Sequence, residues 1–355
     1  MSLMGQEQPY ISHLRLQNVR VHRDISLVIT PDVTLITGRN GSGKTSLLEA
    51  LYIACRGTSF KGVDDEILEK NQPWYRIDVM FSDESKRTIK YDSERQTAKK
   101  KYDINAETHY RLPIKQKLPV VLFEPDDLQL LSGSPTRRRL FLDSLIRSLD
   151  DSYATVMRRY DRALRQRNSL LKRSNVDEET LFAWDVTLSE YGAVIIKKRN
   201  ALVQQLNERI TETYRSIAKN KDIILLNYSY DMSENIQQKL LYNLQSHHQK
   251  DMLMGSTSVG PHRHDFLVFF NNLPAHSVAS RGENRTIILA MKFIEVILLE
   301  KHYDMQPLIL LDDVFGELDN ERQTSLLTEF SGYQIVIASV TTLNFTADHD
   351  SVVML

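Results

Sequence analysis

The chain has 355 residues, a formal net charge of −1, 41% hydrophobic residues, 26% charged residues and one cysteine, Cys55. This is the composition of a globular protein that is long enough for two structural units, or for one domain with a large insertion. The near-zero net charge restricts any nucleic-acid surface to a local patch. The single cysteine excludes an internal disulfide framework, and it suits a buried structural thiol in a reducing compartment.

The first part of the chain predicts strands and no targeting segment. The polar start MSLMGQEQPY lacks the layout of a signal peptide, and no window of the sequence approaches 18 uninterrupted apolar residues. We therefore expect a cytoplasmic protein with no membrane contact. Residues 11–17 and 25–29 alternate apolar and polar side chains and 33–37 is a short β-branched run, so all three segments predict strands.

The segment GRNGSGKT, residues 38–45, follows the third of these strands and precedes an apolar helical pattern. It matches G-x-x-x-x-G-K-[ST], a loop whose backbone N–H groups and following helix N-terminus bind the phosphates of a nucleotide. Lys44 would reach the β- and γ-phosphates of ATP, and the Thr45 hydroxyl would coordinate Mg²⁺. The expected nucleotide contacts are Gly38, Arg39, Asn40, Gly41, Ser42, Gly43, Lys44, Thr45 and Ser46.

Further strands are predicted at 75–81, 86–91 and 118–123, with a hairpin in the hydrophilic piece between the last two. From Thr136 the apolar period changes to three or four residues, which predicts two long amphipathic helices joined by the polar turn SNVDEE at 174–179. At about 30 residues each, these helices would form an arm of roughly 45 Å. The most direct interpretation of the two tryptophans, Trp74 and Trp184, is as core anchors.

A strand at 222–230 and a helix at about 233–250 follow, and strand patterns resume at 266–270, 307–311 and 334–338. The order of patterns is thus αβ, then α-rich, then αβ. We predict an α/β fold with an inserted, mostly α-helical arm domain. The expected division is an ATPase domain at 1–125 and 255–355 and an arm domain at 126–254.

Basic residues cluster in parts of the chain, and an array of Lys and Arg is what neutralises the phosphates of duplex DNA. A charge run can also be a solvated helix face. The candidates for DNA contact are Lys61, Arg137, Arg138, Arg139, Arg158, Arg159 and Arg165. The run from His262 to Asp265 invites a metal site, but no further His or Cys stands at ligand spacing nearby, so loop ordering or a phosphate contact by Arg263 is the alternative.

A polar loop opens the apolar helix that starts near residue 281. The N–H groups of Ser280, Arg281 and Gly282 and the Ser280 hydroxyl can form an anion-binding helix start, and Ser280 with Glu283 also matches a capping box. Because the loop at 38–45 already holds the phosphates of one nucleotide, a second phosphate-binding loop makes sense if it serves the nucleotide of a neighbouring copy.

The segment PLILLDDVFGELD, residues 307–319, predicts a central parallel strand with two carboxylates at its carboxyl end. Asp312 would hold Mg²⁺. Asp313, which faces the other way, would polarise the attacking water as a general base. The alternative is that both residues only cap the strand and open a turn.

The segments GRNGSGKTSLLEAL, VLFEPDDLQLLSGSPTRRRLFLD, SVGPHRHDF, SRGENRT and LLDDVFGELD occur in this order, and together they resemble the RecF family of DNA repair ATPases, which belongs with SMC-like and ABC-type ATPases. The resemblance implies an ABC-type ATPase head with a mixed sheet around the helix of the phosphate loop. It makes 280–284 the ABC signature, which meets ATP held by the other protomer of a head-to-head dimer. It also places Asp319 in a loop that crosses this interface, and Asn18 and Arg20 near the nucleotide.

The sequence departs from the wider ABC pattern in places. The signature reads SRGEN, without the usual second glycine, which bears on how firmly a dimer closes. Asp313 stands where most ABC ATPases carry glutamate, which is usual for the RecF family and fits slow hydrolysis. The run VIASVTT offers no switch histidine, so Ser339 or Thr341 would sense the γ-phosphate, and the glutamine-type loop is assigned to residues 124–126.

The resemblance implies an ATP-dependent homodimer that binds double-stranded DNA at gaps without reading its sequence. Weak, DNA-stimulated hydrolysis of ATP to ADP and phosphate would act as the release timer, and RecR and RecO type mediators would be partners in loading the recombinase. Three alternatives stay open: an SMC-like protein, which needs much longer arms, a nuclease-coupled ATPase, and a transporter ATPase, which needs a shorter helical insert.

Overall fold

The computed structural model describes residues 8–173, 177–230, 232, 235–340 and 351–355. The chain divides into two compact units. The first unit combines residues 1–128 with 295–355, and the second unit is 129–294. The division therefore differs from the expected one at its second boundary, since 255–294 group with the helical residues.

Strand pairing explains this difference. β10 (Phe266–Phe270) pairs antiparallel with β9 (Ile224–Tyr228) and with β11 (Leu273–Pro274), and α9 (Ala275–Val278) follows directly. The strands β9, β10 and β11 form the small three-stranded sheet of the second unit. The long helix α10 (Arg281–Tyr303) begins in the second unit and ends in the first.

The first unit contains a five-stranded sheet in the order β14-β3-β13-β12-β8, and all four strand pairs are parallel. Its central strands β12 and β13 are buried along their whole length, as expected for continuous apolar runs in a parallel sheet. The carboxyl ends of the strands therefore meet at one edge. The five strands are β3 (Val33–Thr37), β8 (Val120–Phe123), β12 (Leu308–Asp312), β13 (Ile335–Ser339) and β14 (Ser351–Met354).

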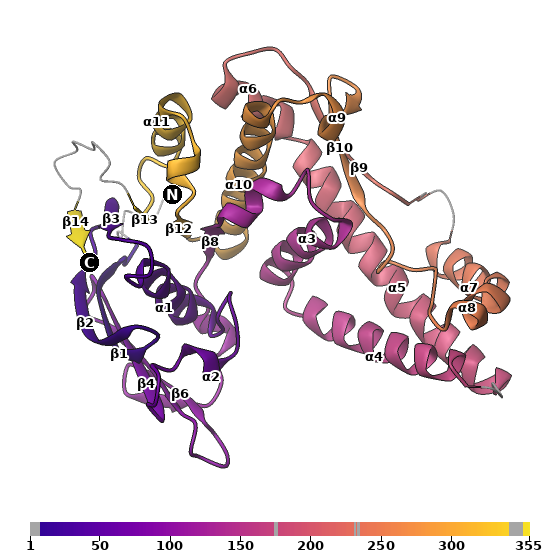
Figure 1. The fold of residues 1–355 in the computed structure, drawn as a ribbon, viewed down its shortest axis with the longest axis horizontal. Coiled ribbons are helices and arrows are strands. Elements are labelled where there is room, and N and C mark those ends of the chain that lie inside the picture. Colours follow the sequence, from indigo (N-terminus) through magenta and orange to yellow (C-terminus); the bar gives the residue numbers. More distant parts are fainter. Residues whose placement is uncertain (1–7, 174–176, 231, 233–234, 341–350) are drawn as a thin grey trace, which may run out of the picture. The chain divides into compact units, whose positions relative to one another are not determined.

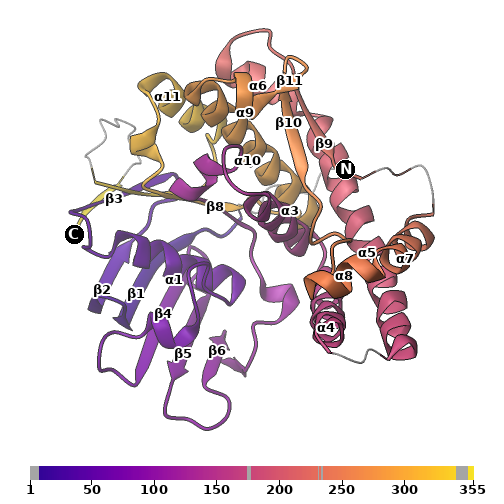
Figure 2. The same ribbon diagram turned by 45° about the vertical axis from the view of Figure 1, so that its right-hand side comes forward.

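A six-stranded antiparallel sheet forms the other part of the first unit, in the order β2-β1-β4-β5-β6-β7. Its inner side chains join one core with both α1 (Lys44–Arg56) and the five-stranded sheet, and Figure 2 shows α1 against these strands. Cys55 lies in this core, where burial raises the pKa of its thiol to about 11, as expected of a structural cysteine. The strands are β1 (Ile11–Val19), β2 (His22–Val28), β4 (Trp74–Phe81), β5 (Lys86–Asp92), β6 (Lys100–Ile104) and β7 (Glu107–His109).

The two tryptophans differ from each other. Trp184 is half-buried against Leu170, Leu171 and Leu181. Trp74 is 41% exposed, so its assignment as a core anchor was wrong. Side chains alternate between the two faces of a strand, and in β4 it is the neighbouring Tyr75 that points into the core.

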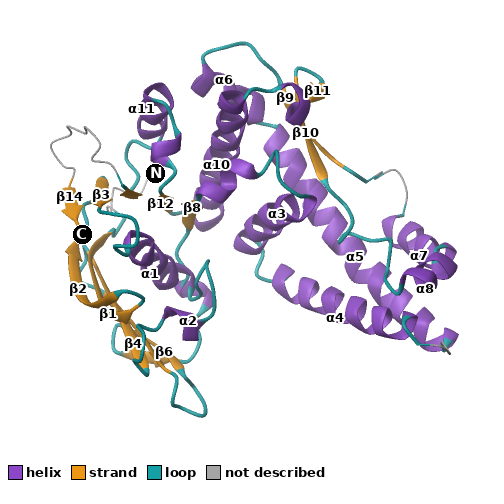
Figure 3. Ribbon diagram, viewed as in Figure 1, coloured by secondary structure: helices purple, strands orange, loops and turns teal. Residues whose placement is uncertain are grey.

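Helices dominate the second unit (Figures 1 and 3). The predicted pair of long helices is present only in part, because the first one is broken at residues 150–152 and the second one at residues 208–209. At the first break the Asp150 carboxylate accepts hydrogen bonds from the backbone N–H and the hydroxyl of Ser152, a local turn that competes with the helix. The helices are α3 (Pro135–Leu149), α4 (Tyr153–Leu171), α5 (Glu178–Asn207), α6 (Ile210–Ala218), α7 (Ile236–Ser246) and α8 (His248–Met254). None of the helices in the described ranges is both long enough and apolar enough to cross a bilayer.

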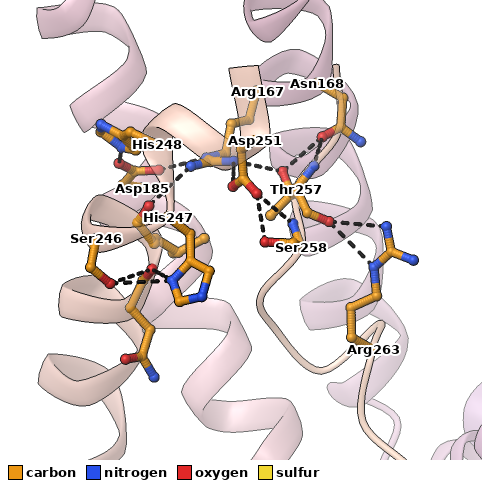
Figure 4. A network of polar contacts seen from close by, with 12 residues as sticks. Arg167, Asn168, Asp185, Ser246, His247, His248, Asp251, Thr257, Ser258 and Arg263 are labelled. Atoms are coloured by element: carbon orange, nitrogen blue, oxygen red, sulfur yellow. Dashed lines mark hydrogen bonds and ion pairs between the residues drawn. The ribbon is translucent and has the colours of Figure 1, made fainter. Parts of the chain in front are cut away.

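A buried ionic network ties α4, α5 and α8 together (Figure 4). The Arg167 guanidinium donates to Asp185 at 2.6 Å and to Asp251 at 2.7 Å, and all three side chains are fully buried. His248 contacts the second oxygen of Asp185, and Thr257 also accepts from Arg167. Every charge in this network therefore has a partner, which is the condition for burying it.

Candidate nucleotide site

The glycine-rich loop lies between the carboxyl end of β3 and the N-terminus of α1. Gly41 and Gly43 adopt left-handed φ angles of 83° and 100°. A Cβ atom at Gly43 would lie 2.2 Å from Nε2 of His22, so no other residue fits there without a shift. The predicted phosphate loop is therefore formed, with the helix N-terminus behind it.

Lys44 is the first residue of α1, and its side chain is buried. Its ammonium group donates hydrogen bonds to the carbonyl oxygens of Gly38 at 2.9 Å and Arg39 at 3.2 Å. The side chain thus curls back over the loop and holds a positive charge inside it. The buried hydroxyl of Ser42 has no hydrogen-bond partner among the described residues, so the loop retains a polar group for an oxygen ligand.

Thr45 and Asp312 bring the two predicted halves of the site together. The Thr45 hydroxyl donates to a carboxylate oxygen of Asp312 at 2.7 Å. Asp312 ends β12 and is only 5% exposed. Its burial raises the pKa of the carboxyl group, while the hydrogen bond from Thr45 and the charge of Lys61 act in the opposite direction.

A hollow of about 490 Å³ opens beside the loop. Several of the residues expected to contact the nucleotide line it, namely Arg20, Asn40, Gly41, Gly43, Lys44, Thr45, Ser46 and Asp313. Asp313 has a left-handed φ of 50° and donates its backbone N–H to the carbonyl of Ala338, so the chain leaves the sheet at this residue. Asn18, which was also expected near the nucleotide, does not line the hollow. It is buried, and its backbone carbonyl accepts a hydrogen bond from the N–H of Glu69, so Asn18 helps to shape this turn.

Four further residues line the hollow that sequence reasoning did not assign to the nucleotide: Val21, Glu49, Lys61 and Glu66. Lys61 was expected to contact DNA, but its ammonium group lies 3.8 Å from Asp312. Glu49 is buried and accepts two hydrogen bonds from Arg20, at 2.9 and 3.0 Å. The one available signal for Glu49 was its position four residues after Thr45, on the same face of α1.

The second predicted phosphate-binding loop belongs to the second unit. The backbone N–H of Ser280 donates to the Glu283 carboxylate at 2.6 Å, and the N–H of Glu283 donates to the Ser280 hydroxyl at 3.2 Å. The capping box is therefore formed at the start of α10. Arg281 is exposed and Gly282 half-buried beside it.

The remaining nucleotide candidates are distributed as follows. Asp319 is the N-cap of α11 (Asn320–Glu329), where it accepts from the N–H and the guanidinium of Arg322. Ser339 is buried at the end of β13, whereas Thr341 lies outside the described residues. Residues 124–126 directly follow β8, the strand that pairs with β12.

The basic candidates separate into internal and exposed groups. Arg138 forms a bidentate ion pair with Asp265, in which Nε and Nη2 of the guanidinium donate to the two carboxylate oxygens at 2.8 and 2.7 Å. The Arg139 guanidinium donates to the backbone carbonyl of His264 at 2.8 Å. Both serve the fold of the second unit. Arg158, Arg159 and Arg165 are exposed on α4, and Arg137 is half-buried.

The histidine run has a structural role. His262 accepts or donates a 2.7 Å hydrogen bond with the Tyr160 hydroxyl, and Arg263 donates to the carbonyl of Thr257. Burial lowers the pKa of both His262 and His264 to about 4. Within the described ranges no cluster of three or more metal-binding side chains occurs.

Known proteins resemble this chain over most of its length. The family described as RecF/RecN/SMC N terminal domain matches residues 10–354. The DNA replication and repair protein RecF of Clostridium perfringens (strain SM101 / Type A) is 33% identical over 334 residues, which cover 92% of each chain. The chain belongs to the RecF family.

Solved structures support the same assignment. The recombination mediator protein RecF-ATPrS of the RecFOR pathway superposes on this RecF-family chain with a TM-score of 0.86 and 28% identity, and the match covers 97% of this chain and 96% of the other. The Smc head bound to the C-winged helix domain of ScpA matches with a TM-score of 0.52 at 14% identity, covering 94% and 90%. The second likeness concerns the fold alone. Together with the RecF match, it confirms the expected fold of an ABC-type head.

Proposed function

We propose that this protein binds ATP with Mg²⁺ in the hollow beside the phosphate loop, dimerises in that state, and grips double-stranded DNA during recombinational repair. The observation that carries this proposal is the hydrogen bond between Thr45 and Asp312. It places a phosphate-loop hydroxyl and a strand-end carboxylate at one point, which is the arrangement found in nucleotide triphosphatases of this loop type.

The residues present fit the nucleotide and the metal. The inward-facing loop, the buried ammonium group of Lys44 and the unpartnered Ser42 hydroxyl suit phosphate oxygens. Hydroxyl and carboxylate oxygens, as supplied by Thr45 and Asp312, are the ligands that Mg²⁺ prefers, and the metal would neutralise charge on the β- and γ-phosphates. Asp313 lines the same hollow and is the general base in this proposal. Its side chain is shorter than the glutamate of most ABC ATPases, which fits hydrolysis slow enough to time release.

The loop that starts at Ser280 would close the site from a second copy. Its capping box fixes the hydroxyl and the first N–H groups of α10 in one direction, and Arg281 stands exposed next to them. A γ-phosphate held by one protomer would therefore find a preformed anion-binding helix start on the other. Asp319 is the second residue proposed for this interface.

DNA contact is proposed for the exposed arginines of α4, namely Arg158, Arg159 and Arg165. Contacts to phosphates are independent of sequence, so the protein would recognise duplex DNA by its backbone, at gaps. RecO and RecR type mediators are the proposed partners in loading the recombinase. Weak stimulation of ATP hydrolysis by DNA would follow if the grip on DNA favours the closed dimer.

Sedimentation of the wild type, Lys44→Met and Ser280→Arg tests the proposal, with ATP, ADP or no nucleotide and with or without duplex DNA. The wild type should dimerise only with ATP. Lys44→Met should lose nucleotide binding, whereas Ser280→Arg should bind ATP and stay monomeric. A Ser280→Arg protein that dimerises normally would contradict the cross-protomer role.

A further inference from the structure

The loop of residues 57–63 connects α1 to the short helix α2 (Asp64–Ile67) and brings Lys61 to the nucleotide hollow. These seven residues form neither helix nor strand. The hydrogen bonds of regular structure therefore do not fix the path of this loop, and its backbone groups need other partners. The position of Lys61 thus depends on contacts that side chains make.

Ser59 provides the central contact of this loop. Its hydroxyl oxygen accepts hydrogen bonds from the backbone N–H groups of Lys61, at 2.8 Å, and of Gly62, at 3.1 Å. The same hydroxyl donates to the carboxylate of Glu49 in α1. Serine commonly forms such a turn with N–H groups that follow it closely in the chain. The backbone of Lys61 is therefore attached to α1 through one side-chain oxygen.

Glu49 is a buried carboxylate on the helix that follows the phosphate loop. It is 1% exposed and lies one turn after Thr45. Its two oxygens accept hydrogen bonds from the guanidinium of Arg20, at 2.9 and 3.0 Å, and one of them also accepts from Ser59. One carboxylate thus connects two cationic residues of the hollow, Arg20 directly and Lys61 through the serine.

A second contact with α1 supports the same loop. The ring of Phe60 packs edge-on against Tyr52, and the two ring centroids are 5.3 Å apart. Tyr52 is three residues after Glu49, so both side chains leave α1 on one face. The Lys61 ammonium group lies 5.9 Å from the centroid of Phe60 and 3.8 Å from an oxygen of Asp312. The loop is therefore anchored on both sides of the bond that leads into Lys61.

Closing the chain between α1 and α2 does not require Ser59. At one end of the loop, Gly57 caps α1 in a left-handed conformation with a φ angle of 83°. Beyond the other end, the Asp64 carboxylate accepts hydrogen bonds from the Tyr75 hydroxyl and the Lys100 ammonium group. The serine contact therefore acts locally, on the residues that it touches, and its removal should leave the fold intact.

We propose that Glu49 and Ser59 are positioning residues of the nucleotide reaction, which hold the Lys61 ammonium group at the phosphates of bound ATP. This inference rests on the proposed function. A cation that is already in place stabilises negative charge as it develops on phosphate oxygens. A displaced cation does so less well, although it still attracts ATP. Loss of the Ser59 hydroxyl should therefore lower kcat far more than it weakens ATP binding.

Hydrogen exchange in the nucleotide-free protein tests the anchor itself. The amide hydrogens of Lys61 and Gly62 should be protected in the wild type, because both are donated to Ser59. Ser59→Ala should speed their exchange about 2-fold to 10-fold, the usual contribution of one hydrogen bond, and Glu49→Gln should speed it less. The matched control is Thr58→Ala, a change at an exposed neighbour, which should exchange as the wild type does.

ATP hydrolysis tests the consequence of the anchor. Ser59→Ala should lower kcat between about 5-fold and 100-fold, the cost of a small misplacement, while the Kd for a labelled ATP analogue changes by less than about 2-fold. Ser59→Thr, which retains a hydroxyl, should recover most of the lost rate. Glu49→Gln should lower kcat by a smaller factor, because a hydrogen bond to a neutral amide is about half as strong as one to a carboxylate. Thr58→Ala should keep the wild-type kcat.

A double-mutant cycle with Lys61→Ala separates positioning from general support of the fold. If Ser59 acts through Lys61, adding Ser59→Ala to Lys61→Ala should change kcat by less than about 2-fold, whereas independent effects would multiply.

Three results would overturn this role while the proposed function stands: multiplied effects in the cycle, equal kcat for the wild type and Ser59→Ala, and wild-type exchange at Lys61 and Gly62 in Glu49→Gln. A wild type that neither binds nor hydrolyses ATP would overturn the proposed function and this role together.

Discussion

Thr45 and Asp312 form a 2.7 Å hydrogen bond across 267 positions of sequence. Thr45 is in the first turn of α1, and Asp312 is at the carboxyl end of β12. The two can meet because β3 and β12 are parallel strands of one sheet, separated only by β13, so their carboxyl ends lie at the same edge. This one contact joins the phosphate loop to the carboxylate that would hold Mg²⁺.

Asp312→Asn should therefore uncouple the metal from the nucleotide. The amide oxygen can still accept from Thr45, so the fold is kept, but the charge that attracts Mg²⁺ is lost. We expect Mg²⁺ to strengthen ATP binding in the wild type, and we expect this gain to fall by about 10-fold to 100-fold in the variant. Calorimetric titration with ATP in Mg²⁺ and in EDTA measures it. Thr45→Ser, which retains the hydroxyl, is the control and should behave as the wild type.

Lys61→Ala should affect ATP more than DNA. Lys61 lines the nucleotide hollow, and its ammonium group is 3.8 Å from Asp312. Loss of this partly exposed cation should weaken ATP binding by a few-fold, on the order of 1 kcal/mol, because one positive charge near the phosphates disappears. Fluorescence anisotropy with a labelled ATP analogue, followed by duplex binding at saturating ATP, separates the two effects. A variant with normal ATP affinity and weaker duplex binding would return Lys61 to the DNA surface.

The sequence was informative where chemistry is local. The loop at 38–45 and the capping box of Ser280 follow from short patterns that dictate their own geometry, and both are formed. Residues whose role depends on long-range packing were not predictable in this way. In the sequence, Lys61 and Arg138 cannot be told apart from the other basic residues. Only the fold places Lys61 near Asp312 and pairs Arg138 with Asp265. The prediction for Trp74 was wrong because the burial of a strand residue depends on the face of the sheet to which its side chain points. A single aromatic residue in the sequence does not indicate that face.

Stability should fall in mild acid because of His262 and His264. Burial lowers the pKa of both to about 4, below the value of about 6.5 expected in the unfolded chain. As the pH falls from about 6.5 to 4, the unfolded state takes up protons that the native state does not, so the free energy of unfolding decreases. Below about pH 4 the native histidines also become protonated and this contribution levels off.

His264→Phe tests this dependence, because the ring can still stack on Tyr230, whose centroid is 4.9 Å away. Urea unfolding at a series of pH values should show a smaller loss of stability in acid for the variant, by on the order of 2–3 kcal/mol at pH 4. Substitution of the exposed His276 by glutamine should leave the pH profile of the wild type unchanged. An identical profile for His264→Phe and the wild type would show that burial does not lower the pKa of His264.

Arg167→Met should destabilise the second unit strongly. The variant fills a similar volume but leaves Asp185 and Asp251 buried without their shared cation, and breaking a buried ionic network from one side costs about 3–5 kcal/mol. Arg165→Met is the matched control, since this arginine is exposed on the same helix and its loss should change stability by less than about 0.5 kcal/mol. Urea unfolding followed by circular dichroism measures both.

Adding Asp185→Asn to Arg167→Met should recover part of the loss, because the added change removes one of the two uncompensated charges. If the double variant is no more stable than Arg167→Met alone, the penalty comes from lost packing around α4 and not from buried charge.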